Sequence, residues 1–369
     1  MKEKITIIVV THNHRYILVK RLLEYYNNFP VKIIIEDASI NKHQFPPKEN
    51  LDYFHFPKKD MFSRIQHATK FSKTKYVTIN QDDDFLLYSS LMKGKKFLDL
   101  NGNYSFVSGK NYYFEDFLDF IHLTEVYKDE ALGSIDDSNN LNRLLKFCNK
   151  SQLLVSSLFN KKHLLKNFDR FNKFQKKIIK KRKNIYCEFA FSLFMLSNYK
   201  YKYLNTAWQL RDRNVYPFGS KSNNKNLRHP IIQSNLYESN SEFRKLHKSI
   251  KEIYKIKNNL VLDNLLKKFI KRFYDRFIEI NKINNSNNYK IKLFFFAPTL
   301  FNILKIINKT FRIVFLERLF SSKSKKNIIN KIDKNEYTKF LYVLKKYKLS
   351  INKLAINKLA LNKLTIGKK

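Results

Sequence analysis

The feature that most constrains the fold of this chain is a continuous run of mostly β-branched residues, Ile5 to Val10. A short run of this kind is typical of a strand that is buried on both faces, as in a parallel sheet. Apolar residues then recur at helical spacing from Tyr16 to Tyr26, and a second β-rich run extends from Val31 to Ile35. Strand, helix and strand in this order predict a βαβ unit.

The pattern repeats once more. An extended piece from Leu51 to Phe56 precedes helical periodicity from Met61 to Phe71, and a β-rich run from Tyr76 to Ile79 then leads into three consecutive aspartates. Ligands of open α/β sheets bind at the carboxyl ends of the strands. The sequence therefore predicts an α/β fold with a doubly wound, mostly parallel sheet, Rossmann-like in its strand order, and a ligand site beside the aspartates.

The three aspartates, Asp82, Asp83 and Asp84, allow two interpretations. Asp82 and Asp84 offer oxygen ligands on alternate residues, which suit Mn²⁺ or Mg²⁺ and, through the cation, the phosphates of a substrate. A solvated acidic turn is the plainer alternative, and it is favoured for an isolated triplet. The neighbouring motifs move the balance toward the metal site.

Three segments share their order and spacing with a known family. They are Ile-Val-Val-Thr-His-Asn-His-Arg (8–15), Ile-Ile-Ile-Glu-Asp-Ala-Ser (33–39) and Lys-Tyr-Val-Thr-Ile-Asn-Gln-Asp-Asp-Asp-Phe (75–85). Together they resemble the nucleotide-binding half of family 2 glycosyltransferases of the GT-A fold. Two departures are that Val10 replaces the usual proline and that no Gly-Ser follows Asp37.

This resemblance implies that Thr11 and Asp37 contact the base or ribose of a nucleotide-sugar donor, and that Asp82 and Asp83 also bind the donor. Nucleotide folds place an acid at the position of Asp37 to accept a hydrogen bond from the nucleoside. The resemblance also implies a divalent cation, Mn²⁺ or Mg²⁺, held by Asp82 and Asp84. Thr11 is equally compatible with a helix N-cap.

Two later segments add candidate residues. Glu188 is the single carboxylate of an apolar helical run, and a buried acid with a raised pKa suits a general base. Similar glycosyltransferases carry their base in this region, whereas a structural Glu paired with a lysine of 180–183 is the alternative. Arg211 and Arg213 end the last predicted strand, where guanidinium groups can clamp a diphosphate or an acceptor phosphate.

The region between these motifs is less specific. Helical periodicity from Tyr88 to Leu100 precedes a strand pattern from Tyr104 to Ser108. The aromatic and acidic run from Tyr112 to Phe117 can stack on a sugar, but we interpret it as core, which is the commoner use of such a stripe.

The charge bounds the partners. The 369 residues carry 72 Lys and Arg against 31 Asp and Glu, a formal net charge of +41. Such a field suits phosphate-bearing substrates, nucleic acid or an anionic membrane alike. The alternative function is therefore a non-catalytic basic protein that binds nucleic acid or an anionic membrane, although no nucleic-acid motif is found. A nucleotidyltransferase would need a Gly- and Arg-rich first loop, and residues 11–15 contain no glycine.

We expect a catalytic domain over 1–220, a helical basic extension over 221–330 and a lysine-rich, weakly ordered tail over 331–369. A basic amphipathic pattern from Pro298 to Phe320 suits a helix in a membrane interface and equally one packed on the catalytic domain. No apolar window approaches the roughly 18 residues of a spanning helix. The two cysteines lack metal-ligand spacing, which favours a reducing compartment. These observations predict a cytoplasmic protein whose membrane contact is at most peripheral, on the inner face.

The predicted activity is transfer of a sugar from a nucleotide-sugar donor to a hydroxyl of a glycan or lipid-linked acceptor. The resemblance implies a metal-dependent, inverting reaction of the kind used in bacterial surface-polysaccharide synthesis. Nucleic acid is not an expected partner.

Overall fold

The computed structural model describes residues 4–13, 15–117, 120–126, 133–150, 154–178, 186–212, 241–257, 260, 262–266 and 329–348. The chain divides into two compact units, residues 1–257 with 332–369, and residues 258–331. The labelled helices and strands belong to the first unit. Arg213 and the predicted interfacial helix Pro298–Phe320 lie outside the described residues.

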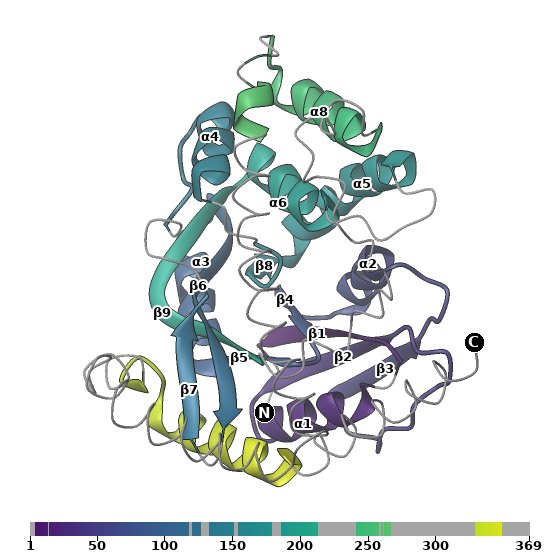
Figure 1. Ribbon diagram of the computed structural model, residues 1–369, viewed down its shortest axis with the longest axis vertical. Helices are drawn as coiled ribbons and strands as arrows, with labels where there is room; N and C mark the ends of the chain where they lie inside the picture. Colours follow the sequence, from purple (N-terminus) through teal and green to yellow (C-terminus); the bar gives the residue numbers. More distant parts are fainter. Residues whose placement is uncertain are drawn as a thin grey trace, which may run out of the picture. The chain divides into compact units, whose positions relative to one another are not determined.

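Four parallel strands form the N-terminal half of the sheet. Their spatial order is β3 (Leu51–His55), β2 (Val31–Asp37), β1 (Ile5–Thr11) and β4 (Tyr76–Gln81). All seven residues of β1 are buried, as its continuous apolar pattern predicts. Helix α1 (Tyr16–Tyr26) joins β1 to β2, α2 (Met61–Phe71) joins β3 to β4, and the two helices lie on opposite sides of these strands (Figure 1).

The rest of the sheet is mixed. It continues through β8 (Leu158–Asn160), β6 (Tyr104–Phe117), β9 (Lys200–Asp212) and β5 (Asp84–Leu86), with β7 (Phe120–Glu125) paired to β6. Strand β8 is antiparallel to β4 and β6, whereas β9 is parallel to β6 and antiparallel to β5. The predicted α/β class is confirmed, with the parallel pairing concentrated in the N-terminal half. The aspartates stand at the junction of β4 and β5.

Three helices lie together on one side of the sheet (Figure 1). These are α5 (Lys161–Ile178), α6 (Tyr186–Asn198) and α8 (Ser241–Tyr254), which lie together above α2 in Figure 1. The ring of Phe62 in α2 lies 4.7 Å from Phe171 in α5 and 5.4 Å from Phe191 in α6, measured between centroids. The remaining labelled helices are α3 (Tyr88–Leu100) and α4 (Asn140–Lys150). None of the described helices is long and apolar enough to cross a membrane.

A C-terminal helix over residues 334–348 packs on the same unit (Figure 1, yellow). The ring of Phe340 lies 5.1 Å from Phe85 of β5 and 5.0 Å from Phe114 of β6. Glu336 is buried and accepts hydrogen bonds from Tyr25 and Ser89. The sequence predicts a weakly ordered tail over 331–369, and this part of it is instead a docked helix. The domain boundaries themselves stay predictions.

Candidate functional site

The acidic turn, defined as Asp82, Asp83 and Asp84, is buried, with 3%, 8% and 3% of these residues exposed. Arg15, the residue before α1, donates from Nε to both oxygens of Asp82 at 2.7 and 2.8 Å. Its Nη2 lies 2.6 Å from Oδ1 of Asp82 and 2.6 Å from Oδ2 of Asp83. The solvated-turn interpretation does not hold, because these carboxylates are enclosed and paired with a guanidinium.

Burial and mutual attraction have opposite effects on this ion pair. Burial raises the pKa of Asp82 to about 6, against the attraction of Arg15. Burial also lowers the pKa of Arg15, but the charges of Asp82 and Asp83 outweigh this effect and raise it. Burial thus favours the neutral acid, whereas Arg15, the partner of Asp82 in the ion pair, favours its charged form.

Thr11 also binds the acidic turn. Its hydroxyl donates to Oδ2 of Asp82 at 2.5 Å. Thr11 is the last residue of β1, whereas the N-cap of α1 is Arg15, so the alternative of a capping threonine does not hold. The β1–β2 register pairs Thr11 with Asp37, which places the two predicted nucleoside contacts on neighbouring strand ends.

A second arginine, Arg21, also contacts the acidic turn. Arg21 of α1 forms a buried ion pair with Asp212, at 2.6 Å between Nη1 and Oδ2, and its Nη2 donates to the backbone oxygen of Asp83 at 3.2 Å. Its guanidinium carbon lies 5.0 Å from the centre of the Phe85 ring. Helix α1, the acidic turn and the end of β9 are therefore tied together by one side chain.

Asp84 faces β9 instead of Arg15. The β5–β9 register sets it opposite Arg211, whose Nε lies 3.3 Å from Oδ2, and Gln209 donates to the same oxygen at 2.9 Å. Burial raises the pKa of Asp84 to about 8, with the charge of Arg211 opposing the shift.

Glu188 lies in the first turn of α6 and is partly exposed. Burial of its carboxyl group raises its pKa, and the positive charge of Arg211 offsets part of the rise. Arg211 thus acts electrostatically on both Glu188 and Asp84. The lysines of 180–183, the partners in the structural alternative, lie outside the described residues.

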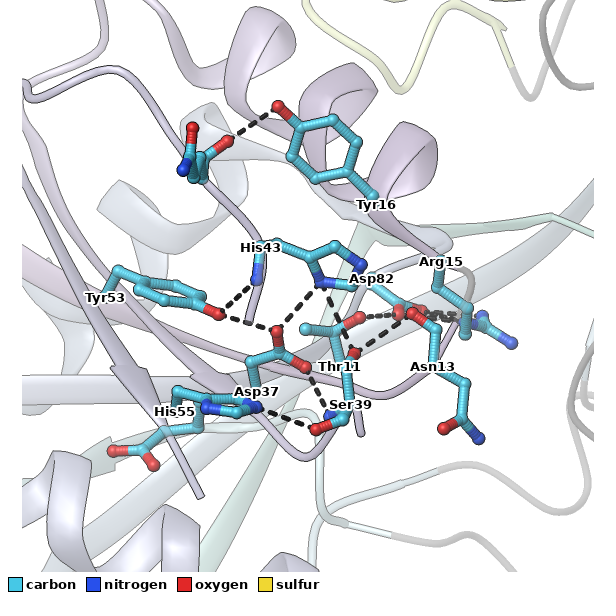
Figure 2. A network of polar contacts seen from close by, with 12 residues as sticks. Thr11, Asn13, Arg15, Tyr16, Asp37, Ser39, His43, Tyr53, His55 and Asp82 are labelled. Carbon is cyan, nitrogen blue, oxygen red and sulfur yellow. Dashed lines mark hydrogen bonds and ion pairs between the residues drawn. The ribbon is translucent and has the colours of Figure 1, made fainter. Parts of the chain in front are cut away.

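Asp37 is fully buried at the end of β2, and both its oxygens are used within the protein (Figure 2). Oδ1 accepts from the backbone N–H of Ser39 at 2.7 Å, and Oδ2 accepts from the hydroxyl of Tyr53 at 2.8 Å and from Nδ1 of His43 at 2.9 Å. Although burial raises its pKa, these hydrogen bonds hold the pKa of Asp37 below its usual range. Asp37 therefore organises the loop after β2.

That loop is also tied to the first one. The hydroxyl of Ser39 donates to the backbone oxygen of Asn13 at 3.0 Å, and Asn13 adopts a positive φ of 55°, which Asn tolerates better than most residues. The ring of Tyr16 stacks on His43 at 5.2 Å between centroids. The two loops therefore form one wall beside the strand ends (Figure 2).

The predicted cation ligands do not form an open site in this arrangement. Both oxygens of Asp82 receive hydrogen bonds from Arg15, and one oxygen of Asp84 is taken by Gln209 and Arg211. Among the described residues no three His, Cys, Asp or Glu side chains are grouped to hold a metal. The carboxylates fit a divalent cation only after Arg15 has moved, and the prediction of Mn²⁺ or Mg²⁺ stays a prediction.

Sequence reasoning assigned no role to Arg15 or Arg21. Arg15 stands in the first motif, but its partner Asp82 is 67 positions away, and Arg21 and Asp212 are 191 positions apart. A charged residue on the buried side of an amphipathic helix is the one local signal that marks Arg21.

Comparisons with known proteins give a fold likeness. No protein-family model matches the sequence, and no curated protein matches it. Similar solved structures include S. aureus TarS 1–349 (TM-score 0.48, 15% identity, 74% of this chain and 72% of that chain). The structure of S. aureus TarS 1–349 in complex with UDP-GlcNAc has a TM-score of 0.47 and 15% identity, over 74% of this chain and 73% of that chain. Francisella tularensis 2-C-methyl-D-erythritol 4-phosphate cytidylyltransferase has a TM-score of 0.34 and 10% identity, over 57% of this chain and 90% of that chain. At these scores and identities the likeness assigns no activity.

Proposed function

We propose that this chain is a GT-A glycosyltransferase that moves a sugar from a nucleotide-sugar donor to a hydroxyl of a glycan or lipid-linked acceptor. The observation that carries the proposal is the gathering of Thr11, the acidic turn, Arg15 and Arg211 at the ends of β1, β4 and β9, with Glu188 near Arg211. Parallel α/β sheets bind nucleotides at the carboxyl ends of their strands.

The arginines supply what a leaving nucleoside diphosphate needs. When the bond between the anomeric carbon and the phosphate oxygen breaks, negative charge accumulates on the diphosphate. Guanidinium groups bind phosphate oxygens in bidentate fashion and can stabilise this charge. Arg15 and Arg211 are held by Asp82 and Asp84. We assign them to the diphosphate, with Arg213 as a further predicted contact.

Glu188 is the proposed general base. Burial raises its pKa, which brings its proton affinity closer to that needed at neutral pH. The carboxylate accepts the proton of the acceptor hydroxyl as the oxygen attacks the anomeric carbon. Attack opposite the leaving diphosphate inverts the configuration at that carbon in one displacement.

Asp37 has an indirect part in this proposal. Its oxygens already have three donors, so its main contribution is to hold Ser39 and His43 beside the end of β1. The nucleoside then binds against the wall formed by the two loops. In this proposal Asp37 supports donor binding by holding the loop after β2, and Thr11 supports it by binding Asp82.

Three parts of the proposal rest on the sequence: peripheral membrane binding, a glycan or lipid-linked acceptor, and a divalent cation. The basic residues of the chain suit an anionic leaflet or a phosphate-bearing acceptor. A peripheral position on the inner membrane face would bring the site to a lipid-linked acceptor.

A thermal-shift panel tests the proposed function. The full chain is heated with UDP, GDP, CDP and their sugar conjugates, each with and without Mn²⁺. A ligand at about 100 times its Kd adds roughly 2.7 kcal/mol to the free energy of unfolding, so a true donor gives a clear shift. Stabilisation by one nucleoside class supports the proposal. A uniform absence of shifts, with or without Mn²⁺, would favour the non-catalytic alternative.

A further inference from the structure

The acidic turn is balanced by side-chain cations. Arg15 contacts Asp82 and Asp83, Arg21 contacts Asp212, and Arg211 contacts Asp84. Among the described residues, each of the carboxylates of Asp82, Asp83, Asp84 and Asp212 thus lies beside a guanidinium. A divalent cation added to this set would find most of its attraction already cancelled.

Arg15 occupies the position that a cation would need. It bridges Asp82 and Asp83 through contacts of 2.6 Å to each, and it is 8% exposed. Asp83 is also 8% exposed, and its Oδ1 is a buried acceptor without a hydrogen-bond partner among the described residues. This oxygen, together with the oxygens that Arg15 now occupies, would be available to a cation that took the place of Arg15.

We propose that Arg15 and a divalent cation compete for Asp82 and Asp83, so that the cation binds only when Arg15 leaves the turn. The inference rests on the proposed function for its purpose. A donor diphosphate would give the displaced guanidinium a new anionic partner, so the donor and the cation would bind cooperatively. Before the donor arrives, Arg15 keeps the buried carboxylates neutralised.

Direct Mn²⁺ binding tests the competition without relying on activity. Free Mn²⁺ is followed by electron paramagnetic resonance in titrations of the full chain, with no nucleotide present, for the wild type, Arg15→Gln and Arg15→Lys. Removing the competing charge should tighten Mn²⁺ binding by at least about 10-fold in Arg15→Gln. Arg15→Lys keeps the charge but loses the bidentate contact, so its affinity should fall between the two.

Lys20→Gln is the matched control. Lys20 lies on α1 and its Nζ is 4.5 Å from the centre of the Tyr16 ring, so this variant removes one positive charge near the site but not from the acidic turn. Its Mn²⁺ affinity should equal that of the wild type. If Lys20→Gln tightens binding as much as Arg15→Gln, general charge and not competition explains the effect.

Other outcomes overturn the proposal or separate it from the proposed function. Equal or weaker Mn²⁺ binding in both Arg15 variants would show that Arg15 does not compete with the cation. If Arg15→Gln does not fold, Arg15→Lys and the wild type still decide, because competition requires the lysine form to bind more tightly. If Arg15→Gln binds Mn²⁺ more tightly but the wild type binds no nucleotide, the competition between Arg15 and the cation is supported and the proposed glycosyltransferase function is rejected.

Discussion

Glu336→Ala removes a contact that joins the C-terminal helix, residues 334–348, to the rest of the first unit. Glu336 is 3% exposed, and its Oε1 accepts from the hydroxyl of Tyr25 at 2.6 Å and from the backbone N–H of Tyr88. Its Oε2 accepts from the backbone N–H of Ser89 at 3.1 Å and from the Ser89 hydroxyl at 2.7 Å. Tyr88 begins α3, and Leu87, the N-cap residue, offers no side-chain cap. Glu336 therefore caps α3 from a distant part of the chain.

The expected loss of stability follows from these partners. Truncation leaves the fully buried hydroxyl of Tyr25 without an acceptor, which costs about 1–3 kcal/mol. Loss of an N-cap costs about 1 kcal/mol more. The free energy of unfolding should therefore fall by roughly 3 kcal/mol. At about 2–4 °C per kcal/mol, the expected decrease in Tm is roughly 6–12 °C.

Differential scanning fluorimetry measures this shift. Lys345→Ala is the matched control, because Lys345 is an exposed residue of the same helix. Its Tm should stay close to that of the wild type. A Glu336→Ala variant whose Tm equals that of Lys345→Ala would refute the docked position of residues 334–348 and return this segment to a loose tail.

Three further predictions concern donor binding, the pH dependence of stability and membrane binding. Asp37→Ala should weaken donor binding by about 1–3 kcal/mol, because the loop after β2 loses its common acceptor, and calorimetry should find the metal dependence unchanged. The pKa of Asp84 is raised from 3.8 to about 8, so the folded protein retains a proton that the unfolded chain releases, and stability should fall as pH rises between these values. Asp84→Asn should flatten this part of the Tm–pH curve, and an unchanged slope would exclude Asp84 as its source. The full chain should sediment with anionic liposomes at low salt and be released at high salt if it is peripheral, whereas equal binding to neutral liposomes would count against that position.

Local sequence patterns predicted much of the fold. The bounds predicted for Met61–Phe71 and Tyr88–Leu100 coincide with α2 and α3, because both helices have clear apolar periodicity. The run from Tyr112 to Phe117 belongs to β6, and Tyr112 and Phe114 are buried, as the core interpretation predicts.

The strand β6 was predicted too short because of an irregular register. The predicted strand ends at Ser108, where a glycine interrupts the pattern, but β6 continues to Phe117. A Cβ on Gly109 would lie 2.6 Å from the backbone oxygen of Thr206 in β9, so the close approach of the two strands requires glycine there. The β6–β9 register also shifts between Ser108 and Lys110.

The candidate site was predictable only in its parts. The motifs located Thr11, Asp37 and the acidic turn, since each stands at or just after the end of a strand. The contacts that build the candidate site join distant positions: Arg15 to Asp82, Arg211 to Asp84 and Arg21 to Asp212. Single-sequence periodicity holds no information on such pairs, so the occupied state of the acidic turn could be found only in three dimensions.

The most direct test of a glycosyltransferase is the release of nucleoside diphosphate from a sugar donor. The donor identified by the thermal-shift panel is incubated with the wild type, Glu188→Gln and the control Glu252→Gln, whose glutamate is exposed on α8. The account predicts release that depends on an added hydroxyl acceptor. Turnover should fall by roughly 10²–10⁴ in Glu188→Gln, with donor affinity kept, and stay normal in Glu252→Gln. Release by Glu188→Gln at the wild-type rate would remove Glu188 as the base, and no release from any donor by the wild type would contradict the proposed function itself.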